Sequence, residues 1–317
     1  MQELSKIKKV DVDRDIKLQD RLTALGILGG YRHLLTCDST NNVLKKLSQN
    51  IILRKQQSNH SIVTPPFINV THGETSGEPL DQKFEPGELP YVITADEQTA
   101  GRGRQSSTWW TGQEALAFSM LLDAKQYGLK PQTSVQLSLG IGFAAMQALR
   151  TLTVEAMGET QNNANRSAIP MPNIEIRWPN DVYVNNRKIS GILIESANAH
   201  HFVIGIGVNT NNSAADSPEE IRDRIVTLRD VLGQKIEQDR LIFLLCREIM
   251  RILNYFPLRF PQLIAKIEAN LHQLGKIVNI SRENDQIVGK CLGMNPDGSL
   301  RVLTETNEKA VISGVAL

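Results

Sequence analysis

Cysteine is scarce in this sequence, which has only Cys37, Cys246 and Cys291 among 317 residues. The three are scattered, form no Cys-x-x-Cys pair and have no neighbouring histidine at metal-ligand spacing. This pattern argues against a disulfide framework and against a zinc site. It fits a reducing compartment, so we expect a cytoplasmic protein.

The chain also lacks an excess of charge of either sign. Lys and Arg number 35 against 34 Asp and Glu, which leaves a formal net charge of +1. No global field therefore favours nucleic acid or an acidic membrane surface. Residues 1–20 contain neither the apolar core of a signal peptide nor a run long enough to span a bilayer. We expect a protein that binds neither DNA nor membranes.

Two polar stretches interrupt the pattern of the chain. Residues 58–90 are rich in Pro and Gly, and residues 158–172 in Asn, Ser and Pro. Such compositions bury too little apolar surface to offset the entropy lost on ordering, so both are predicted to be surface loops. Since the length exceeds one ordinary domain, we expect an N-terminal extension at 1–30, a large unit at 31–272 and a small unit at 273–317.

Helical and strand patterns alternate through the large unit. Apolar residues at helical spacing predict helices over residues 39–53, 133–154, 239–254 and 261–271. Short β-rich runs predict strands over residues 91–95, 117–122, 173–178, 182–184, 189–195 and 202–208, with a hairpin turn at Asn185-Asn186. From Gly275 onward, short strands at hairpin spacing predict a small β-barrel. The fold class is therefore α/β (α+β), a mixed sheet with helices and a small β-domain.

Gly101, Arg102, Gly103 and Arg104 form a Gly-Arg alternation between two predicted strands. Glycine lets peptide N–H groups approach an anion closely, and the guanidinium groups add planar donors suited to phosphate or carboxylate. The alternation is therefore a candidate phosphate loop. Taken alone, it fits an exposed basic turn before a strand better. Its place between strands argues against a disordered RNA-binding tail.

Residues 177–181, Arg-Trp-Pro-Asn-Asp, end one predicted strand and turn at the proline. Asn180 and Asp181 then lie just beyond the end of this strand, where polar side chains can hold a lysine or a metal-bound phosphate. Lys188 follows next to an apolar run, so its ammonium group is expected to lie in a site that is partly shielded from water. Taken singly, a plain β-turn and a solvated lysine are the alternatives.

In order and together, these segments resemble the signatures of the biotin protein ligases. The matching segments are Asp38-Ser39-Thr40-Asn41, Gln98 with residues 101–104, Trp109, residues 178–181, Lys188 with Gly191, and residues 204–209. Gly275-Lys276 and the turn at 295–300 resemble that family's SH3-like domain. The resemblance covers residues 37–317 outside the two loops. It implies a catalytic domain related to class II synthetases, followed by the small barrel.

The resemblance also implies an activity. Biotin would be activated with ATP and Mg²⁺ to biotinyl-5'-AMP, then transferred to a lysine of a biotin carboxyl-carrier domain of a carboxylase, of the acetyl-CoA carboxylase type. A homodimer is compatible with it. Only 38 residues precede Ser39, too few for the winged helix and linker of bifunctional members. We therefore expect a monofunctional ligase without repressor activity.

The resemblance assigns roles to particular residues. Lys188 and Arg104 are the expected catalytic residues. The expected biotin-binding residues are Ser39, Thr40, Asn41, Gln98, Arg102, Gly103, Arg104, Lys188 and Gly191. The expected nucleotide-binding residues are Gly101, Arg102, Arg104, Trp109, Asn180, Asp181 and Asn209, with Asp181 as the candidate Mg²⁺ contact. Residues 105–108 lack the further Arg and Gly of many relatives, so loop closure is expected to be weaker.

Three alternatives stay open. Residues 140–145 match the dinucleotide fingerprint Gly-x-Gly-x-x-Ala, but one helical stripe continues through both glycines, which argues against a nicotinamide oxidoreductase. Lipoate or octanoate transfer uses the same general fold and carrier-lysine chemistry. A non-catalytic binding module on a ligase scaffold is the third, and intact Lys188, Arg102 and Arg104 count against it.

Overall fold

A computed structural model describes residues 12–24, 26, 28–58, 89–105, 107–161, 170–282, 285–311 and 315–316. The predicted loop at 58–90 lies almost wholly outside these residues. The second predicted loop is only partly described, and its predicted start was too early, because helix α3 (Ser134–Gln161) continues through Gly158.

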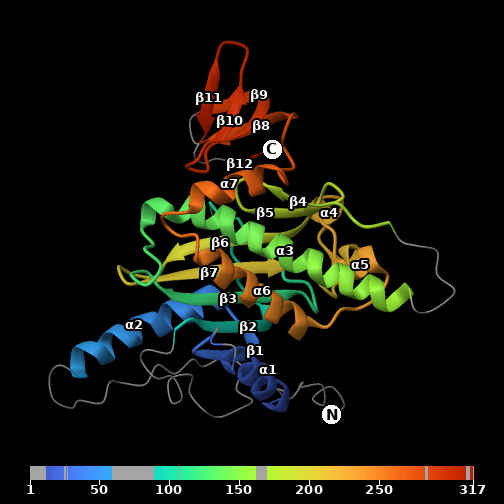
Figure 1. Ribbon diagram of the computed structural model, residues 1–317. Coiled ribbons are helices and arrows are strands. Elements are labelled where there is room, and N and C mark those ends of the chain that lie inside the picture. The colour runs from blue at the N-terminus through green and yellow to red at the C-terminus, as the bar shows by residue number, and fades with distance from the viewer. Residues whose placement is uncertain are drawn as a thin grey trace.

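A seven-stranded mixed sheet forms the centre of the protein (Figure 1). Its order is β1-β2-β3-β7-β6-β5-β4, with β1 and β2 parallel and all other neighbours antiparallel. The strands are β1 (Gly30–Cys37), β2 (Tyr91–Gln98), β3 (Leu116–Asp123), β4 (Ile174–Arg177), β5 (Asp181–Val184), β6 (Arg187–Ser196) and β7 (His201–Val208). The six predicted strands are confirmed, and β1 is an addition.

The predicted hairpin turn between β5 and β6 is also confirmed. Asn185 and Asn186 have φ of 49° and 66°. Two consecutive left-handed residues match the right-handed twist of the flanking strands, and asparagine tolerates this conformation. The turn therefore brings Lys188 back alongside β5.

Helices α3 and α6 (Gln238–Leu253) cover one face of the sheet (Figure 1). With η1 (Pro131–Thr133), α3 is the one helix of the described chain long and apolar enough to cross a membrane, yet 78% of its apolar window is buried inside the protein. Gly140 lies within it, where a Cβ would come 3.0 Å from Ile252 Cγ2. The Gly-x-Gly-x-x-Ala run thus serves helix packing, and no strand-to-helix turn exists there.

Several further helices complete the described fold. α7 (Phe260–Glu268) confirms the fourth predicted helix. The remaining elements were not predicted; they are α1 (Val12–Ala24), η2 (Ala214–Asp216), α4 (Glu219–Arg222) and α5 (Leu228–Leu232). Part of the expected N-terminal extension is structural, because α1 packs on β1 and α6 and buries Leu18 and Leu22.

The opposite face of the sheet is covered only in part. Helix α2 (Thr40–Ser58) lies over β2, β3 and β7. It buries Val43, Leu44, Leu47 and Ile51 against Tyr91, Ile93, Leu121 and Val203. The rest of this face, toward β6 and β5, is left to the cavity described below.

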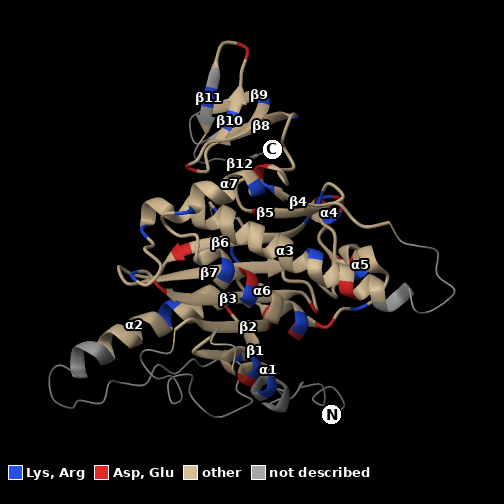
Figure 2. Cartoon of the chain, in the orientation of Figure 1, with Lys and Arg blue, Asp and Glu red and all other residues tan. Residues whose placement is uncertain are grey.

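A five-stranded antiparallel sheet forms the C-terminal part, in the order β11-β10-β9-β8-β12. Its strands are β8 (Ile277–Arg282), β9 (Asp285–Met294), β10 (Leu300–Leu303), β11 (Glu308–Val311) and β12 (Val315–Ala316). It confirms the predicted small β-domain. Lys and Arg are interspersed with Asp and Glu across both parts, in keeping with the balanced charge (Figure 2).

The turn before β5 joins the two sheets. The buried Trp178 donates from Nε1 to the carbonyl oxygen of Gly298, at 3.1 Å. The amide of Gln273 accepts from the backbone N–H of Trp178 and donates to its carbonyl, both at 2.9 Å. These bonds fix the backbone immediately before Asn180 and Asp181.

Candidate active site

Small residues on three neighbouring strands form the floor of a cavity of about 820 Å³. Ala117 of β3 lies opposite Gly207 of β7, and Gly207 lies opposite Gly191 of β6. A Cβ at Gly207 would come 2.3 Å from the indole of Trp109, and one at Gly205 would come 2.4 Å from Asn41 Oδ1. Glycine is therefore required for these side chains to lie flat on the sheet.

One end of the cavity carries Ser39, Thr40, Asn41 and Gln98, the predicted biotin-binding residues that the resemblance assigns to the rings of biotin; we call it the ring-binding end. Ser39, Thr40 and Asn41 are each only 3% exposed, at the start of α2. The Oε1 atom of Gln98 accepts from the N–H of Thr40 at 2.9 Å and from its hydroxyl at 3.2 Å. Ser119 lies within 2.7 Å of the Thr40 hydroxyl and 2.6 Å of Asn41 Oδ1.

Ser119 is a member of this network that the sequence-based prediction missed. It is fully buried in β3, whose other residues before Asp123 are apolar or alanine. A hydroxyl at the centre of an apolar strand requires a buried hydrogen-bond partner, and that requirement was the available signal. It links the residues from α2 to the central sheet.

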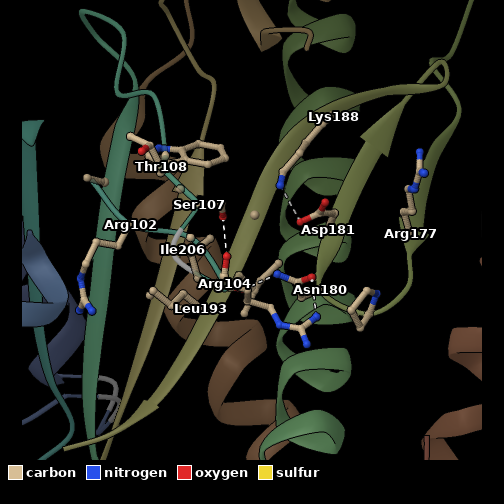
Figure 3. A pocket seen from close by; sticks show the side chains of 18 of the residues that line it. Arg102, Arg104, Ser107, Thr108, Arg177, Asn180, Asp181, Lys188, Leu193 and Ile206 are labelled. Atoms are coloured by element: carbon tan, nitrogen blue, oxygen red, sulfur yellow. Dashed lines mark hydrogen bonds and ion pairs between the residues drawn. The ribbon is translucent and has the colours of Figure 1, made fainter. Parts of the chain in front are cut away.

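The Gly-Arg segment forms a narrow loop beside the cavity. The N–H of Gly103 donates to the carbonyl oxygen of Ser107 at 2.7 Å, and the N–H of Trp109 to that of Gly101 at 3.0 Å. Arg102 turns away from Lys188 (Figure 3). Its guanidinium pairs with both carboxylate oxygens of Glu195, at 3.0 and 2.7 Å.

Arg104 lies under the same loop, beside Asn180 (Figure 3). Its Nη1 donates to Asn180 Oδ1 at 3.3 Å, while Asn180 Nδ2 donates to the carbonyl oxygen of Ile192 at 2.7 Å. The second bond fixes the orientation of the amide, so that its oxygen faces the guanidinium. Burial lowers the pKa of Arg104, an effect that the nearby Asp181 opposes.

A β-bulge directs Lys188 into the cavity. The pairing of β5 with β6 shifts register between Val182 and Tyr183, so that Asp181 faces Gly191 and Tyr183 faces Lys188. One extra residue, Ile189, is accommodated, which places Lys188 on the same face as Gly191. The N–H of Lys188 donates to the carbonyl oxygen of Arg224 at 2.8 Å, and this pairing holds the bulged strand.

The ammonium group of Lys188 is held in place by a neighbouring carboxylate. Lys188 Nζ lies 2.8 Å from Asp181 Oδ1, and the two side chains are 30% and 20% exposed (Figure 3). It also lies 5.7 Å from the centroid of the Trp109 ring, within range of a cation–π interaction. Trp109 lines the cavity, and its buried Nε1 has no hydrogen-bond acceptor within the described parts of the chain.

Two predicted residues do not line the cavity. Gly101 packs against the returning part of its own loop, where a Cβ would come 2.6 Å from the carbonyl oxygen of Trp109. Asn209 is 2% exposed, and its Oδ1 accepts from Asn212 at 3.3 Å. Residues that line it without having been predicted include Arg177, Tyr183, Asn186, Asp223 and Arg224. Of these, Arg177 belonged to the recognised segment 177–181 and Asn186 to the predicted hairpin turn.

Comparisons with known proteins agree with this geometry. A family model described as the Biotin/lipoate A/B protein ligase family matches residues 66–209. The biotin protein ligase of Aquifex aeolicus, solved in complex with biotin and ATP, superposes with a TM-score of 0.65. Its sequence is 27% identical, and the alignment covers 91% of this chain and 97% of that one. Over residues 66–209 the chain is similar to the biotin/lipoate protein ligase family, and its fold is similar to that of the A. aeolicus biotin protein ligase.

Curated relatives extend the likeness in sequence. The bifunctional ligase/repressor BirA of Bacillus subtilis is 32% identical over 223 residues, which are 68% of this chain and 62% of that protein. The biotin–[acetyl-CoA-carboxylase] ligase of Mycobacterium tuberculosis is 27% identical over 210 residues, covering 66% of this chain and 71% of the relative. The chain spans about 59–64% of the length of the bifunctional BirA proteins of B. spizizenii, B. subtilis and Escherichia coli.

Proposed function

We propose that the protein is an ATP-dependent ligase that activates biotin as biotinyl-5'-AMP and transfers it to a lysine of a carrier domain. The observation that carries the proposal is convergence in one cavity. Lys188 from β6, Arg104 from the Gly-Arg loop and Thr40 from α2 all line it. These three segments bring a lysine, a guanidinium and a polar ring-binding end onto one floor of small residues.

In the first reaction, an oxygen of the biotin carboxylate attacks the α-phosphorus of ATP, and the bond to pyrophosphate breaks. Negative charge develops on the α-phosphoryl oxygens and the leaving group. Lys188, kept in place by Asp181 at 2.8 Å, supplies a fixed positive charge for these oxygens. Arg104, oriented by Asn180, supplies planar donors. Donors oriented before the reaction stabilise the transition state without reorganising during it.

In the second reaction, the neutral amine of the carrier lysine attacks the acyl carbon of the mixed anhydride. The bond from the acyl carbon to the AMP oxygen breaks, AMP leaves and the attacking nitrogen loses a proton. No cysteine nucleophile is required, and Cys37 near the cavity is unsuited, since burial raises the pKa of its thiol to about 12. The acceptor we propose is a carboxyl-carrier domain of the acetyl-CoA carboxylase type.

Magnesium is expected to reach the cavity bound to ATP. Asp181, the predicted contact, is already engaged by Lys188, and the described residues contain no group of three or more His, Cys, Asp or Glu able to hold a metal. The side chains therefore do not fit a resident Mg²⁺ site. We propose that the ion binds through the phosphates of the nucleotide, as Mg²⁺ commonly does.

We propose the same division of the chain into three parts as the sequence predicts. The extension at 1–30, the catalytic unit at 31–272 and the small unit at 273–317 remain proposed boundaries, as do a cytoplasmic location and a homodimer. The roles of Gly103, Gly191 and Asn209 toward biotin or nucleotide are likewise proposed.

The test is incubation of the chain with ATP, Mg²⁺, biotin and a biotin carrier domain, with mass spectrometry of the carrier. The expected result is one biotinyl addition on the carrier lysine. Parallel reactions with lipoate and octanoate, each with its own carrier domain, test the runner-up function, because the matching family description names lipoate as well as biotin. Modification with lipoate or octanoate and none with biotin would replace the proposed substrate.

A further inference from the structure

Glu195 lies near the end of β6, two steps of strand alternation beyond Gly191 on the cavity side of the sheet. Its side chain is only 16% exposed. Three donors from two elements converge on its carboxylate. Asn41 and Lys45 come from α2, and Arg102 comes from the Gly-Arg loop.

The bond from Asn41 reaches the ring-binding end. Asn41 Nδ2 donates to Glu195 at 2.8 Å, and Asn41 Oδ1 accepts from Ser119 at 2.6 Å. Both ends of the amide are therefore committed, and the side chain lies flat over Gly205. Through Ser119 and Thr40 the same network continues to Gln98.

The bonds from Arg102 reach the loop. The guanidinium and carboxylate form two parallel bonds, at 3.0 and 2.7 Å, a geometry that gives both strength and a fixed orientation. Arg102 also pairs through its backbone with Thr108, across the narrow part of the loop. Glu195 thus holds the loop at the residue between its two glycines.

We propose that Glu195 is a positioning residue that couples the Gly-Arg loop to the acid-binding end of the cavity and thereby sets how long the activated acid is retained. This inference rests on the proposed ligase function for its substrate, but the contacts that carry it are independent of that function. A ligand in the ring-binding end restricts the motion of Asn41. Because the Glu195 carboxylate is bonded to both Asn41 and Arg102, it then restricts the motion of the loop as well.

The ionisation of Glu195 fits this role. Burial tends to raise its pKa, but hydrogen bonds from Lys45, Asn41 and Arg102 outweigh burial, and the net shift is downward from 4.5. Because its pKa is lowered, the carboxylate is still charged at pH 4.5 and somewhat below. The pairing is lost only as the pH falls through the lowered pKa. Retention should therefore be constant between about pH 6 and about pH 8.

The decisive variant is Glu195→Gln, which preserves size and removes the charge. Loss of a charge-assisted, partly buried hydrogen bond corresponds to about 10–100-fold in an equilibrium constant. We expect the acyl-adenylate to dissociate faster by about that factor, measured as label released from the enzyme and as modification of bystander lysines. Single-turnover transfer from adenylate still bound should stay within about twofold of wild type, since no reacting atom is touched.

The matched control is Glu155→Gln. Glu155 also makes two bonds to an arginine, Arg240, at 2.9 and 2.6 Å, but between α3 and α6 on the opposite face of the sheet. Retention should be unchanged in this variant. In the double variant Arg102→Gln with Glu195→Gln, the N–H groups of Gly103 and Trp109 should exchange no faster without substrates than in Glu195→Gln alone, because both changes break the same Arg102–Glu195 contact.

Amide hydrogen exchange without substrates provides a readout that does not depend on activity. In Glu195→Gln the N–H groups of Gly103 and Trp109 should exchange faster, and in Glu155→Gln at the wild-type rate. Wild-type exchange and retention in Glu195→Gln, or additive effects in the double variant, would overturn the coupling. If wild type forms no acyl-adenylate, the proposed function fails, and the exchange comparison still decides the role of Glu195.

Discussion

The two faces of the central sheet are formed by the same strands but differ in the size and polarity of their side chains. Along β7, Ile204, Ile206 and Val208 belong to the large apolar core on the side of α3 and α6. Between them, Gly205 and Gly207 form the cavity floor on the other side. β3 repeats the contrast, with Phe118 and Met120 in the core and Ala117 and Ser119 toward the site.

The contrast shows how stability and chemistry are separated within one strand. The core face gains stability from close packing of large side chains. The other face gives up that gain and contains a buried polar network and space for a ligand. We therefore expect substitutions on the two faces to differ in kind, with stability affected on one side and chemistry on the other.

The largest effect on the site face is expected for Lys188→Ala. Loss of one preorganised donor lowers turnover by about 10²–10³-fold. The thermal midpoint should change little, because Lys188 is 30% exposed and packs no core. Pyrophosphate release in a steady-state assay, together with a melting curve, measures both. Near-normal adenylation in this variant would exclude the proposed role.

Two residues of β7 provide a direct comparison of the two faces. Ile204→Ala removes buried methyl groups from the core and should destabilise the protein by about 2–5 kcal/mol. Gly207→Ala should leave stability nearly unchanged but displace Trp109, whose ring would lie 2.3 Å from the new Cβ. Because Trp109 is an expected nucleotide-binding residue, we expect about a tenfold rise in the KM for ATP. Denaturant unfolding and steady-state kinetics on both variants test the pair, and equal effects on stability would contradict the contrast.

Arg104→Gly tests the loop. The variant loses the contact with Asn180 and a guanidinium over the cavity. We expect activated biotin to escape and modify bystander lysines at least about tenfold faster, as loss of one charge-assisted hydrogen bond allows. Labelling of an added unrelated protein measures the escape. Strict carrier specificity in this variant would remove retention from the functions of Arg104.

The smallest effect is expected where the two sheets meet. Trp178→Phe removes the bond from Nε1 to the carbonyl oxygen of Gly298. The expected cost is about 1 kcal/mol of unfolding free energy, with the Lys188 chemistry retained. Urea unfolding with activity measured in parallel tests it. A loss of turnover as large as that of Lys188→Ala would show that the small sheet acts directly on the reaction.

Much of the fold could be predicted because its elements carry strong periodicity. The alternation of residues 202–208 and the helical stripe of residues 239–254 predicted β7 and α6. By contrast, β1 mixes Arg32, His33 and Thr36 with apolar residues and gives a weak strand pattern. In helix α1 the apolar residues stand singly among polar and charged ones, and their burial depends on tertiary contacts with β1 and α6.

The sequence predicted several of the segments that line the cavity but not the geometry of the cavity. The segments containing Thr40, Arg104 and Lys188 were recognised, and the structure brings them together. That Lys188 faces the cavity depends on the bulge in β6, which strict alternation does not predict. Glu195 gave no signal of its own, because its partners Asn41, Lys45 and Arg102 are distant in sequence.

The most direct test of the account is a crystal structure of the protein with a non-hydrolysable analogue of biotinyl-5'-AMP. The account predicts the analogue on the floor formed by Gly191, Gly205 and Gly207, with its acyl-phosphate linkage within hydrogen-bond distance of Lys188 Nζ and its ring system beside Thr40 and Gln98. An analogue bound elsewhere, or one whose linkage lies away from Lys188, would contradict the claim that this face of the sheet carries the chemistry.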